Sequence, residues 1–239
     1  GVPEEGERAT ILNTHTVVLT SDAIIGELNI ATGGELQLDN HTLSVTGDGI
    51  TNLGIFAAQT GTVDYSANAD QCISPLDYYN LTISGTGTKT LCGDIGIAND
   101  LEILGTSSTL FVDADAANNY SIDLEGDWRS SGTFIPREGR VMFSGSGTQS
   151  VVRNDGGVHN FYKLEIMPGT SLDINHNLSI QDSLTMKGGN IDNQGYTITL
   201  GLNATQKGSL LHESGTITGN LKRWISTADA GNNIRFPVG

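Results

Sequence analysis

Basic residues and long hydrophobic runs are scarce in this chain of 239 residues. Only 12 Lys and Arg residues stand against 27 Asp and Glu residues, so the formal charge is −15 at pH 7. A surface of this sign repels nucleic acid phosphates and anionic lipid headgroups. No apolar run approaches the ~18 residues that a membrane span needs, and no charged-then-apolar leader opens the sequence. We therefore expect neither a nucleic acid partner nor insertion into a membrane.

Motifs for metal and nucleophilic chemistry are also missing. The histidines are scattered, and neither a His-x-His nor a His-Glu-x-x-His spacing occurs, so zinc chemistry has no support. The Gly-x-Ser-x-Gly motif of nucleophilic hydrolases is absent, as is the Gly-Gly-x-Gly-x-Asp repeat of calcium-binding rolls. We expect no catalytic residues and no resident cofactor.

Helical patterning is absent as well. The richest helical candidate, residues 114–117, is too short to nucleate a helix alone. From Thr10 onward, Val, Ile, Leu and Thr instead alternate with polar residues in short runs that Gly, Asn or Asp interrupts, as in 16–20 and 28–30. Period-two alternation is typical of short strands half-buried against a core. The sequence therefore predicts an all-β protein.

An internal repeat organises the chain. Segment 61–65 (GTVDY) returns as 139–143 (GRVMF), and segment 79–83 (YNLTI) returns as 162–166 (YKLEI). If Leu28, Leu101 and Leu184 are taken as equivalent starts, the chain holds two units of 73 and 83 residues and part of a third. Each unit contains about three strand-turn-strand stretches of ~20–30 residues, the length of one turn of a β-solenoid.

Two β architectures compete for this pattern. An antiparallel sandwich needs hairpin turns, but Asp-Gly and Asn-Gly pairs are scarce, with 48–49 and 155–156 as the main examples. Parallel coils explain the self-similarity better, because each turn stacks like residues on the previous one at ~4.8 Å. We predict a single right-handed parallel β-helix (β-solenoid) of about nine or ten coils. Residues 1–10 form a lead-in or an N-terminal cap, 11–225 form the solenoid, and 226–239 begin a further region or a partial cap.

The two cysteines, Cys72 and Cys92, are 20 residues apart, so they can lie on adjacent turns. Their repeat equivalents, Ser150 and Asn175, both lack a thiol, so the two cysteines are present together and absent together. This favours a disulfide and an oxidising, extracytoplasmic location. Two buried free thiols are the alternative.

Two further groups of residues are weak candidates for ligand contacts. Asp113 and Asp115 lie in one Asp- and Asn-rich region and could bind Ca²⁺, although a solvated turn uses the same residue types. Tyr65, Tyr78 and Phe161 are candidates for stacking on a glycan. Core packing is the favoured interpretation of the aromatic residues, because several of them occupy equivalent repeat positions.

Three segments carry a resemblance to a known family: 79–91 (YNLTISGTGTKTL), 132–143 and 219–239. They resemble the repeats of large secreted Bacteroidota surface proteins, which are often exported by the type IX secretion system and are predicted to contain parallel β-helices. The likeness covers about 24–239. It implies an extracellular, adhesin-like protein at the cell surface, of which this chain is a segment.

These observations predict a non-enzymatic extracellular rod or stalk segment with a structural or adhesive role. Its expected partners are neighbouring segments of the same protein or like subunits, and surface glycans. A self-assembling filament subunit, with solenoids stacked end to end, is one alternative. A polysaccharide lyase-like or glycan-binding β-helix is another, and it requires acidic and basic side chains to converge in one groove.

Overall fold

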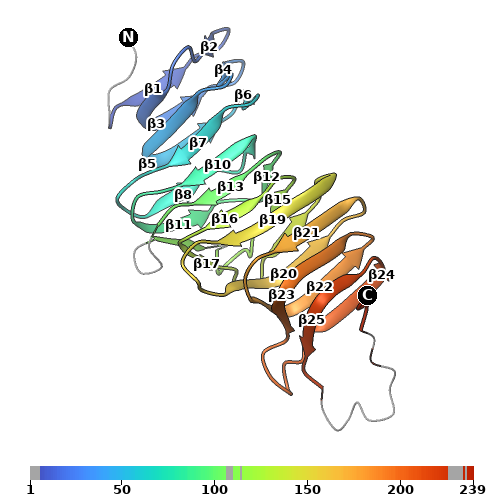
Figure 1. Ribbon diagram of the computed structural model, residues 1–239. Coiled ribbons are helices and arrows are strands. Elements are labelled where there is room, and N and C mark those ends of the chain that lie inside the picture. The colour runs from blue at the N-terminus through green and yellow to red at the C-terminus, as the bar shows by residue number, and fades with distance from the viewer. Residues whose placement is uncertain (1–5, 106–109, 114, 226–233, 235) are drawn as a thin grey trace.

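The computed structural model describes residues 6–105, 110–113, 115–225, 234 and 236–239. This part of the chain contains 25 strands and no helix. The strands stack along the molecule, with the first and last turns at opposite ends (Figure 1). The strands are β1 (Arg8–Ile11), β2 (Thr16–Val18), β3 (Ala23–Ile30), β4 (Glu35–Gln37), β5 (Thr42–Asn52), β6 (Ile55–Ala57), β7 (Thr62–Tyr65), β8 (Gln71–Ile73), β9 (Asp77–Tyr78), β10 (Asn80–Ile83), β11 (Gly87–Leu91), β12 (Ile95–Ile97), β13 (Leu101–Ile103), β14 (Leu110–Asp113), β15 (Ile122–Leu124), β16 (Trp128–Ser130), β17 (Thr133–Ile135), β18 (Arg140–Phe143), β19 (Gly147–Arg153), β20 (His159–Ile166), β21 (Thr170–Ile174), β22 (Leu178–Lys187), β23 (Asn190–Leu200), β24 (Ser209–Ser214) and β25 (Ile217–Arg223).

Every strand pairing in the described part is parallel. β10, for example, pairs with β7 on one side and with β13 on the other, so each partner lies about one turn away along the chain. The chain thus winds into a β-solenoid of about ten turns, which confirms the predicted fold class. The right-handed sense of the coil stays a prediction.

Three strands make one turn, so three ladders run along the solenoid. β11, β12 and β13 belong to the first, second and third ladder, and they pair one turn later with β14, β15 and β16. Longer strands bend around a corner and take part in two ladders. The first half of β20 pairs only with β22, whereas its second half pairs with both β18 and β22.

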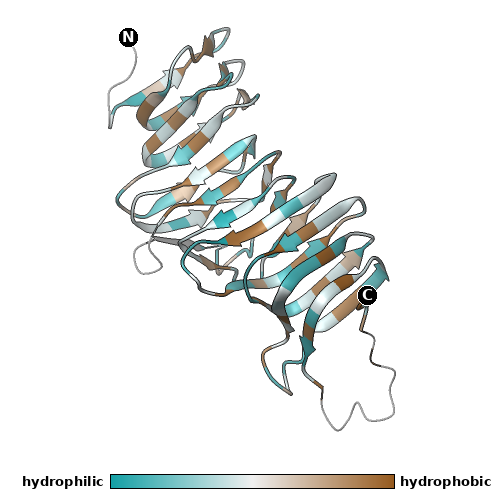
Figure 2. Ribbon diagram, viewed as in Figure 1, coloured by the Kyte–Doolittle hydropathy of each residue, from teal (hydrophilic) through white to brown (hydrophobic). Residues whose placement is uncertain are grey.

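The core is made of columns of apolar side chains that repeat from turn to turn. Alternation within each strand sends every second residue inward, and Figure 2 shows hydrophobic positions alternating with hydrophilic ones along neighbouring strands. Burying these side chains is the main stabilising contribution, at roughly 25 cal/mol per Å² of apolar surface. One column of the third ladder contains Leu43, Val63, Leu81, Leu101, Trp128 and Val151, and one of the second contains Ile95, Ile122, Val141, Leu164 and Leu184.

These columns show how the sequence repeat maps onto the fold. Leu81 stacks between Val63 and Leu101 in the third ladder. Its repeat equivalent Leu164 stacks between the equivalents of those two residues, but in the second ladder. The proposed starts Leu28, Leu101 and Leu184 likewise fall in three separate ladders. Four full turns would bring a repeated residue back to the same ladder, but each repeat unit is one strand shorter than four turns. Equivalent residues in successive repeats therefore keep equivalent stacking neighbours but lie in a different ladder of the solenoid.

Corner positions are held by Asp and Asn side chains that bind the backbone of the next turn. Asp22 Oδ1 accepts a hydrogen bond from the Thr42 amide at 2.8 Å, and Asp127 Oδ1 accepts one from the Ser150 amide at 2.7 Å. A corner interrupts strand pairing, and a short acceptor side chain supplies the partner that the amide would otherwise lack. Part of the large acidic content thus has a structural use.

The described part of the terminal segment adds a pairing at the last turn. The Ile217 amide donates to the Pro237 carbonyl at 2.7 Å, and the Gly239 amide donates to the Ile217 carbonyl at 3.2 Å. Residues 237–239 therefore lie along the outer edge of β25. Among the described residues, no helix is long and apolar enough to cross a membrane.

Candidate functional site

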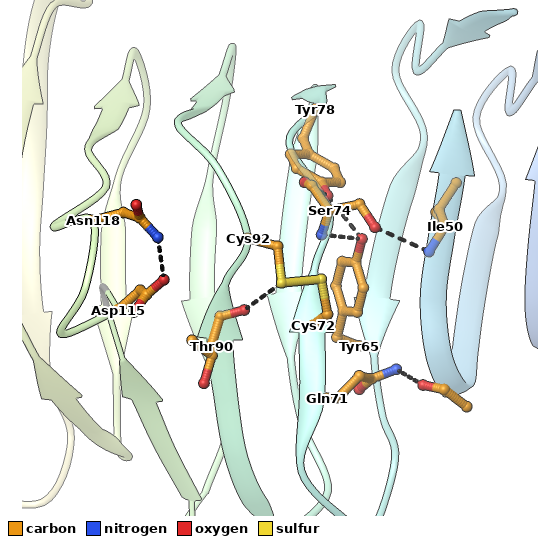
Figure 3. The surroundings of a disulfide bond; sticks show 11 residues. Ile50, Tyr65, Gln71, Cys72, Ser74, Tyr78, Thr90, Cys92, Asp115 and Asn118 are labelled. Atoms are coloured by element: carbon orange, nitrogen blue, oxygen red, sulfur yellow. Dashed lines mark hydrogen bonds between the residues drawn. A yellow bond between two sulfur atoms is a disulfide. The ribbon is translucent and has the colours of Figure 1, made fainter. Parts of the chain in front are cut away.

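The two cysteines form a disulfide that joins neighbouring turns (Figure 3). Cys72 lies in β8 and Cys92 directly follows β11, the next strand of the first ladder, and their Cα atoms are 5.8 Å apart. Cys92 is exposed and Cys72 is partly exposed, so the bridge lies on the outer surface. The predicted pairing is confirmed. A disulfide indicates an oxidising, non-cytoplasmic environment.

The first ladder is interrupted next to this disulfide. β8, β11, β14 and β17 form a sheet of their own, and β8 does not pair with β5 in the turn before it. The Ser74 hydroxyl bridges the break, because its Oγ accepts a hydrogen bond from the Ile50 amide at 2.9 Å. The serine therefore connects β8 to β5 where ladder hydrogen bonds are missing, whereas the disulfide reinforces the paired strands on the other side of β8.

Two tyrosines fill the core behind the break (Figure 3). Tyr65 and Tyr78 are buried, and their hydroxyl oxygens are 2.8 Å apart. The Tyr78 hydroxyl donates to the Ser74 carbonyl at 2.6 Å, and the Ser74 amide donates to the Tyr65 hydroxyl at 3.0 Å. Burial raises the pKa of both phenols. The hydrogen bonds satisfy groups that burial would otherwise leave unpaired.

The proposed glycan-stacking residues are therefore wrong. Tyr65, Tyr78 and Phe161 are all buried, with exposed fractions of at most 2%. Phe161 packs against Trp128 at a ring separation of 5.2 Å, inside the core. The competing interpretation, core packing, is confirmed for these three residues. An aromatic residue on a period-two strand can face either way, and here each faces inward.

The two candidate calcium ligands have other partners. The Arg137 guanidinium binds both carboxylate oxygens of Asp113, at 2.8 Å and 2.6 Å. Asp115 closes a tight turn by accepting hydrogen bonds from the Ala117 amide and the Asn118 side chain, which hold its pKa below the usual value. No group of three or more His, Cys, Asp or Glu side chains in the described part is placed to hold a metal ion. Calcium binding at Asp113 and Asp115 stays a prediction.

Acidic and basic side chains do converge in one hollow near the N-terminal turns. This hollow has a volume of about 330 Å³ and is lined by Arg8, Glu27 and Asp48, together with Asn29 and Ser74. Arg8 Nη2 lies 2.5 Å from Glu27 Oε2, so the guanidinium is already paired. The arrangement offers hydrogen bonds of both kinds to a polar ligand. No sequence motif singled these residues out.

A histidine is buried in the core of the later turns. His159 is 2% exposed, and its ring packs near Trp128 and Phe161. Burial and the nearby Arg153 charge lower the pKa of His159 to about 4. The ring is therefore neutral at pH 7. Trp128 Nε1 and His159 Nε2 have no hydrogen-bond partner among the described residues.

Comparisons with known proteins find no relative. No family model matches the sequence, and neither a curated protein nor a solved structure does. The fold and the side-chain geometry therefore carry the functional argument.

Proposed function

We propose that this chain is a segment of an extracellular rod or stalk at a bacterial cell surface, with a structural and adhesive role and no enzymatic activity. The observation that carries the proposal is the run of stacked apolar columns through consecutive parallel turns. Each turn adds length while its backbone pairs with the turn before it, so a solenoid becomes longer by adding further turns of the same kind.

Two surface features support this role. The Cys72–Cys92 bridge joins two adjacent turns covalently, so that in a pulled solenoid these turns do not depend on ladder hydrogen bonds alone. It also fits an oxidising location outside the cytoplasm. The acidic balance keeps an elongated surface from binding polyanions. On the basis of the sequence likeness, the proposal includes an origin among secreted Bacteroidota surface proteins and export by the type IX secretion system.

Pulling single molecules by their two ends tests the rod. We expect the chain to keep its length at low force and then to unravel turn by turn, in steps of roughly 20–27 residues, or about 70–90 Å of extended chain. The residues between the cysteines should contribute extension only after reduction. A chain that lengthens smoothly, at forces that merely straighten an unfolded polypeptide, would contradict a load-bearing role.

A filament subunit is the second candidate, favoured by the edge strand β24. Among the described strands, β24 pairs only with β22, so its other edge has no strand partner. Bare edges recruit further strands. Electron microscopy of concentrated protein distinguishes this candidate from the rod, because it predicts fibres that lengthen with protein concentration, whereas a stalk segment stays a single particle.

A lyase or glycan-binding module is the third candidate, favoured by the hollow around Arg8, Glu27 and Asp48. Incubation with neutral and acidic polysaccharides tests the enzymatic form. We expect no new reducing ends and no absorbance from unsaturated products. Turnover that disappears in Glu27→Gln would replace our proposal with an enzyme.

A further inference from the structure

A second hollow lies near the C-terminal turns, at a corner between the first and second ladders. Its volume is about 330 Å³, and it is lined by Tyr162 of β20, by Gln181 and Asp182 of β22, and by Leu202 and Gln206 of the loop 201–208. Lys207 of the same loop and Ser209, the first residue of β24, complete one side. All these side chains are at least partly exposed, so the hollow opens on the surface.

A bulge at this corner positions the aromatic ring. Phe161 pairs with Ile180 and Lys163 pairs with Ser183, so Tyr162 alone lies opposite the two residues Gln181 and Asp182. The alternation therefore slips at Tyr162, whereas Phe161 remains buried. A bulge of this kind redirects a side chain and is typical of functional positions in sheets.

The facing wall is a loop held in shape by its own hydrogen bonds. Asn203 Oδ1 accepts hydrogen bonds from the amides of Thr205 and Gln206, both at 2.9 Å, and the Leu202 amide donates to the Gln206 carbonyl at 2.8 Å. The loop is closed at its base by Gly201 and Gly208, which have φ values of 87° and 69°. A Cβ at Gly208 would lie 2.7 Å from the Gly201 nitrogen, so the approach requires glycine. The wall is therefore preformed.

The lining combines an aromatic ring with groups that both donate and accept hydrogen bonds. Gln181 and Gln206 offer amides, Ser209 a hydroxyl, Asp182 a carboxylate and Lys207 an ammonium group. The Lys163 ammonium lies 5.4 Å from the centroid of the Tyr162 ring. Burial, followed by the charges of Asp182 and Glu138, raises the pKa of Tyr162, so its hydroxyl stays protonated and able to donate.

This chemistry matches a sugar more closely than an anion or an apolar molecule. Sugar hydroxyls donate and accept as the amides do, and the C–H face of a pyranose packs on an aromatic ring. The carboxylate of Asp182 and the ammonium of Lys207 both line the hollow, so its walls carry charges of both signs and favour a neutral ligand over a phosphate or a uronate. A volume of about 330 Å³ is at the small end of ligand pockets, so one or two sugar units fit.

We propose that this hollow, the Tyr162 site, binds a neutral hexose unit of a surface glycan. The site supplies a ligand for the adhesive part of the role proposed above and rests on that role for its biological use. Tyr162 packs against the sugar face, and Gln181, Asp182 and Gln206 bind its hydroxyls.

The internal repeat provides a matched control. Tyr79 is the repeat equivalent of Tyr162 and is also half-buried at a corner. There, however, the residue equivalent to Asp182 is Asp100, whose carboxylate binds Arg129 at 2.5 Å and the Asp127 amide at 2.9 Å. At the Tyr79 corner the carboxylate of Asp100 is therefore already bound within the protein. At the Tyr162 corner the equivalent residue, Asp182, lines a hollow.

Nuclear magnetic resonance of the full chain, titrated with cellotetraose, mannotriose, galactobiose and polygalacturonate in turn, tests the site. At least one neutral oligosaccharide should shift the amide signals of Tyr162, Gln181 and Gln206 together. Tyr162→Ala should weaken that binding about tenfold or more, since stacking on the ring is lost. Tyr162→Phe should keep most of the affinity, and Tyr79→Ala should leave it unchanged.

Three results would overturn the proposal: no shift at millimolar neutral sugar, binding of the polyuronate alone, or equal affinity in Tyr162→Ala. An unchanged pattern of amide signals outside the site shows that each variant is folded. Failure of this site leaves the single-molecule extension of the rod unaffected, so the two proposals fail separately.

Discussion

At the scale of single residues, polar side chains inside the solenoid bind the backbone of neighbouring turns. Lys89 is fully buried, and its Nζ donates to the carbonyls of Ala67, Ala69 and Thr86 at 2.6–2.8 Å. Burial lowers the pKa of Lys89. The three carbonyls offset part of the cost of placing a charge there. Such residues fix how one turn sits on the next at a corner.

Gln71 and Gln149 are repeat equivalents that lie in different ladders. Each side chain binds the backbone of the preceding turn. Gln71 Nε2 donates to the Val45 and Gly47 carbonyls at 2.9 Å and 2.6 Å, and Gln149 Nε2 donates to two carbonyls of its own preceding turn at 3.0 Å and 2.6 Å. Each Oε1 also accepts from the amide four residues earlier in the chain. The two copies thus share a complete set of hydrogen bonds.

We therefore expect Gln71→Ala and Gln149→Ala to have similar effects. Each substitution leaves buried backbone groups unpaired and should lower the free energy of unfolding by about 2 kcal/mol. Urea unfolding measures the loss. The control Gln37→Ala, in which the side chain binds only the side chains of Glu35 and Gln59 and no backbone group, should change stability by less than about 0.5 kcal/mol. An effect of Gln149→Ala as small as that of the control would contradict the shared role.

His159 gives the chain a defined acid sensitivity. Its pKa is about 4 in the folded protein and about 6.5 in an unfolded chain. The unfolded state therefore binds more protons between these values, and the free energy of unfolding falls as the pH drops from 6.5 towards 4. The full loss is on the order of 3 kcal/mol, and the contribution is constant above pH 6.5.

Urea midpoints of the wild type and of His159→Phe, measured from pH 7 to pH 4, test this. The variant removes the titrating ring but keeps an aromatic group near Trp128 and Phe161, and it should show a shallower pH dependence. His15→Gln, at an exposed site, should follow the wild type. Parallel curves for the wild type and His159→Phe would show that His159 does not set the slope.

Sequence patterns predicted some of these residues and missed others. The joint presence and absence of two cysteines across the repeat predicted the disulfide. Alternation does not say which side of a strand faces inward, so Tyr78, in a strand of two residues, was misplaced. Lys89 and Gln149 occupy inward positions where alternation predicts apolar residues. Tyr162 is brought to its hollow by a bulge that no local motif announces.

At the scale of elements, the disulfide lies next to an interruption of the first ladder. β8 has no strand partner in the turn before it, and the side chains of Ser74 and Gln71 make the connection to β5. The bridge closes a segment of 20 residues, which limits the freedom of the unfolded chain. It also holds the strand beside the break to the turn that follows.

Reduction should therefore destabilise the protein by about 3 kcal/mol. Thermal unfolding with and without a reductant measures the change. The double variant Cys72→Ser, Cys92→Ser should unfold at the same temperature as the reduced wild type and should not respond to the reductant. Equal melting temperatures for oxidised and reduced wild-type protein would show that the bridge adds nothing to stability.

At the scale of the whole molecule, the fold is a stack in which each turn depends on its neighbours. The strand-turn-strand stretches within each repeat predicted parallel turns of roughly this length, because hairpin turn signals are scarce and parallel coils account for the self-similarity. The side on which each segment lies did not follow from the sequence. The change of ladder is already present at Val141, the equivalent of Val63, and so it precedes the longer corner segment before Phe161.

The proposed rod and the proposed glycan site both depend on parallel, in-register stacking. Nuclear Overhauser contacts in an isotope-labelled sample test this stacking most directly. We predict contacts that join Leu81 to both Val63 and Leu101, and Leu164 to both Val141 and Leu184, in the pattern of parallel strands. Strong contacts between the Hα protons of paired strands, as antiparallel neighbours give, would contradict the solenoid and the rod together.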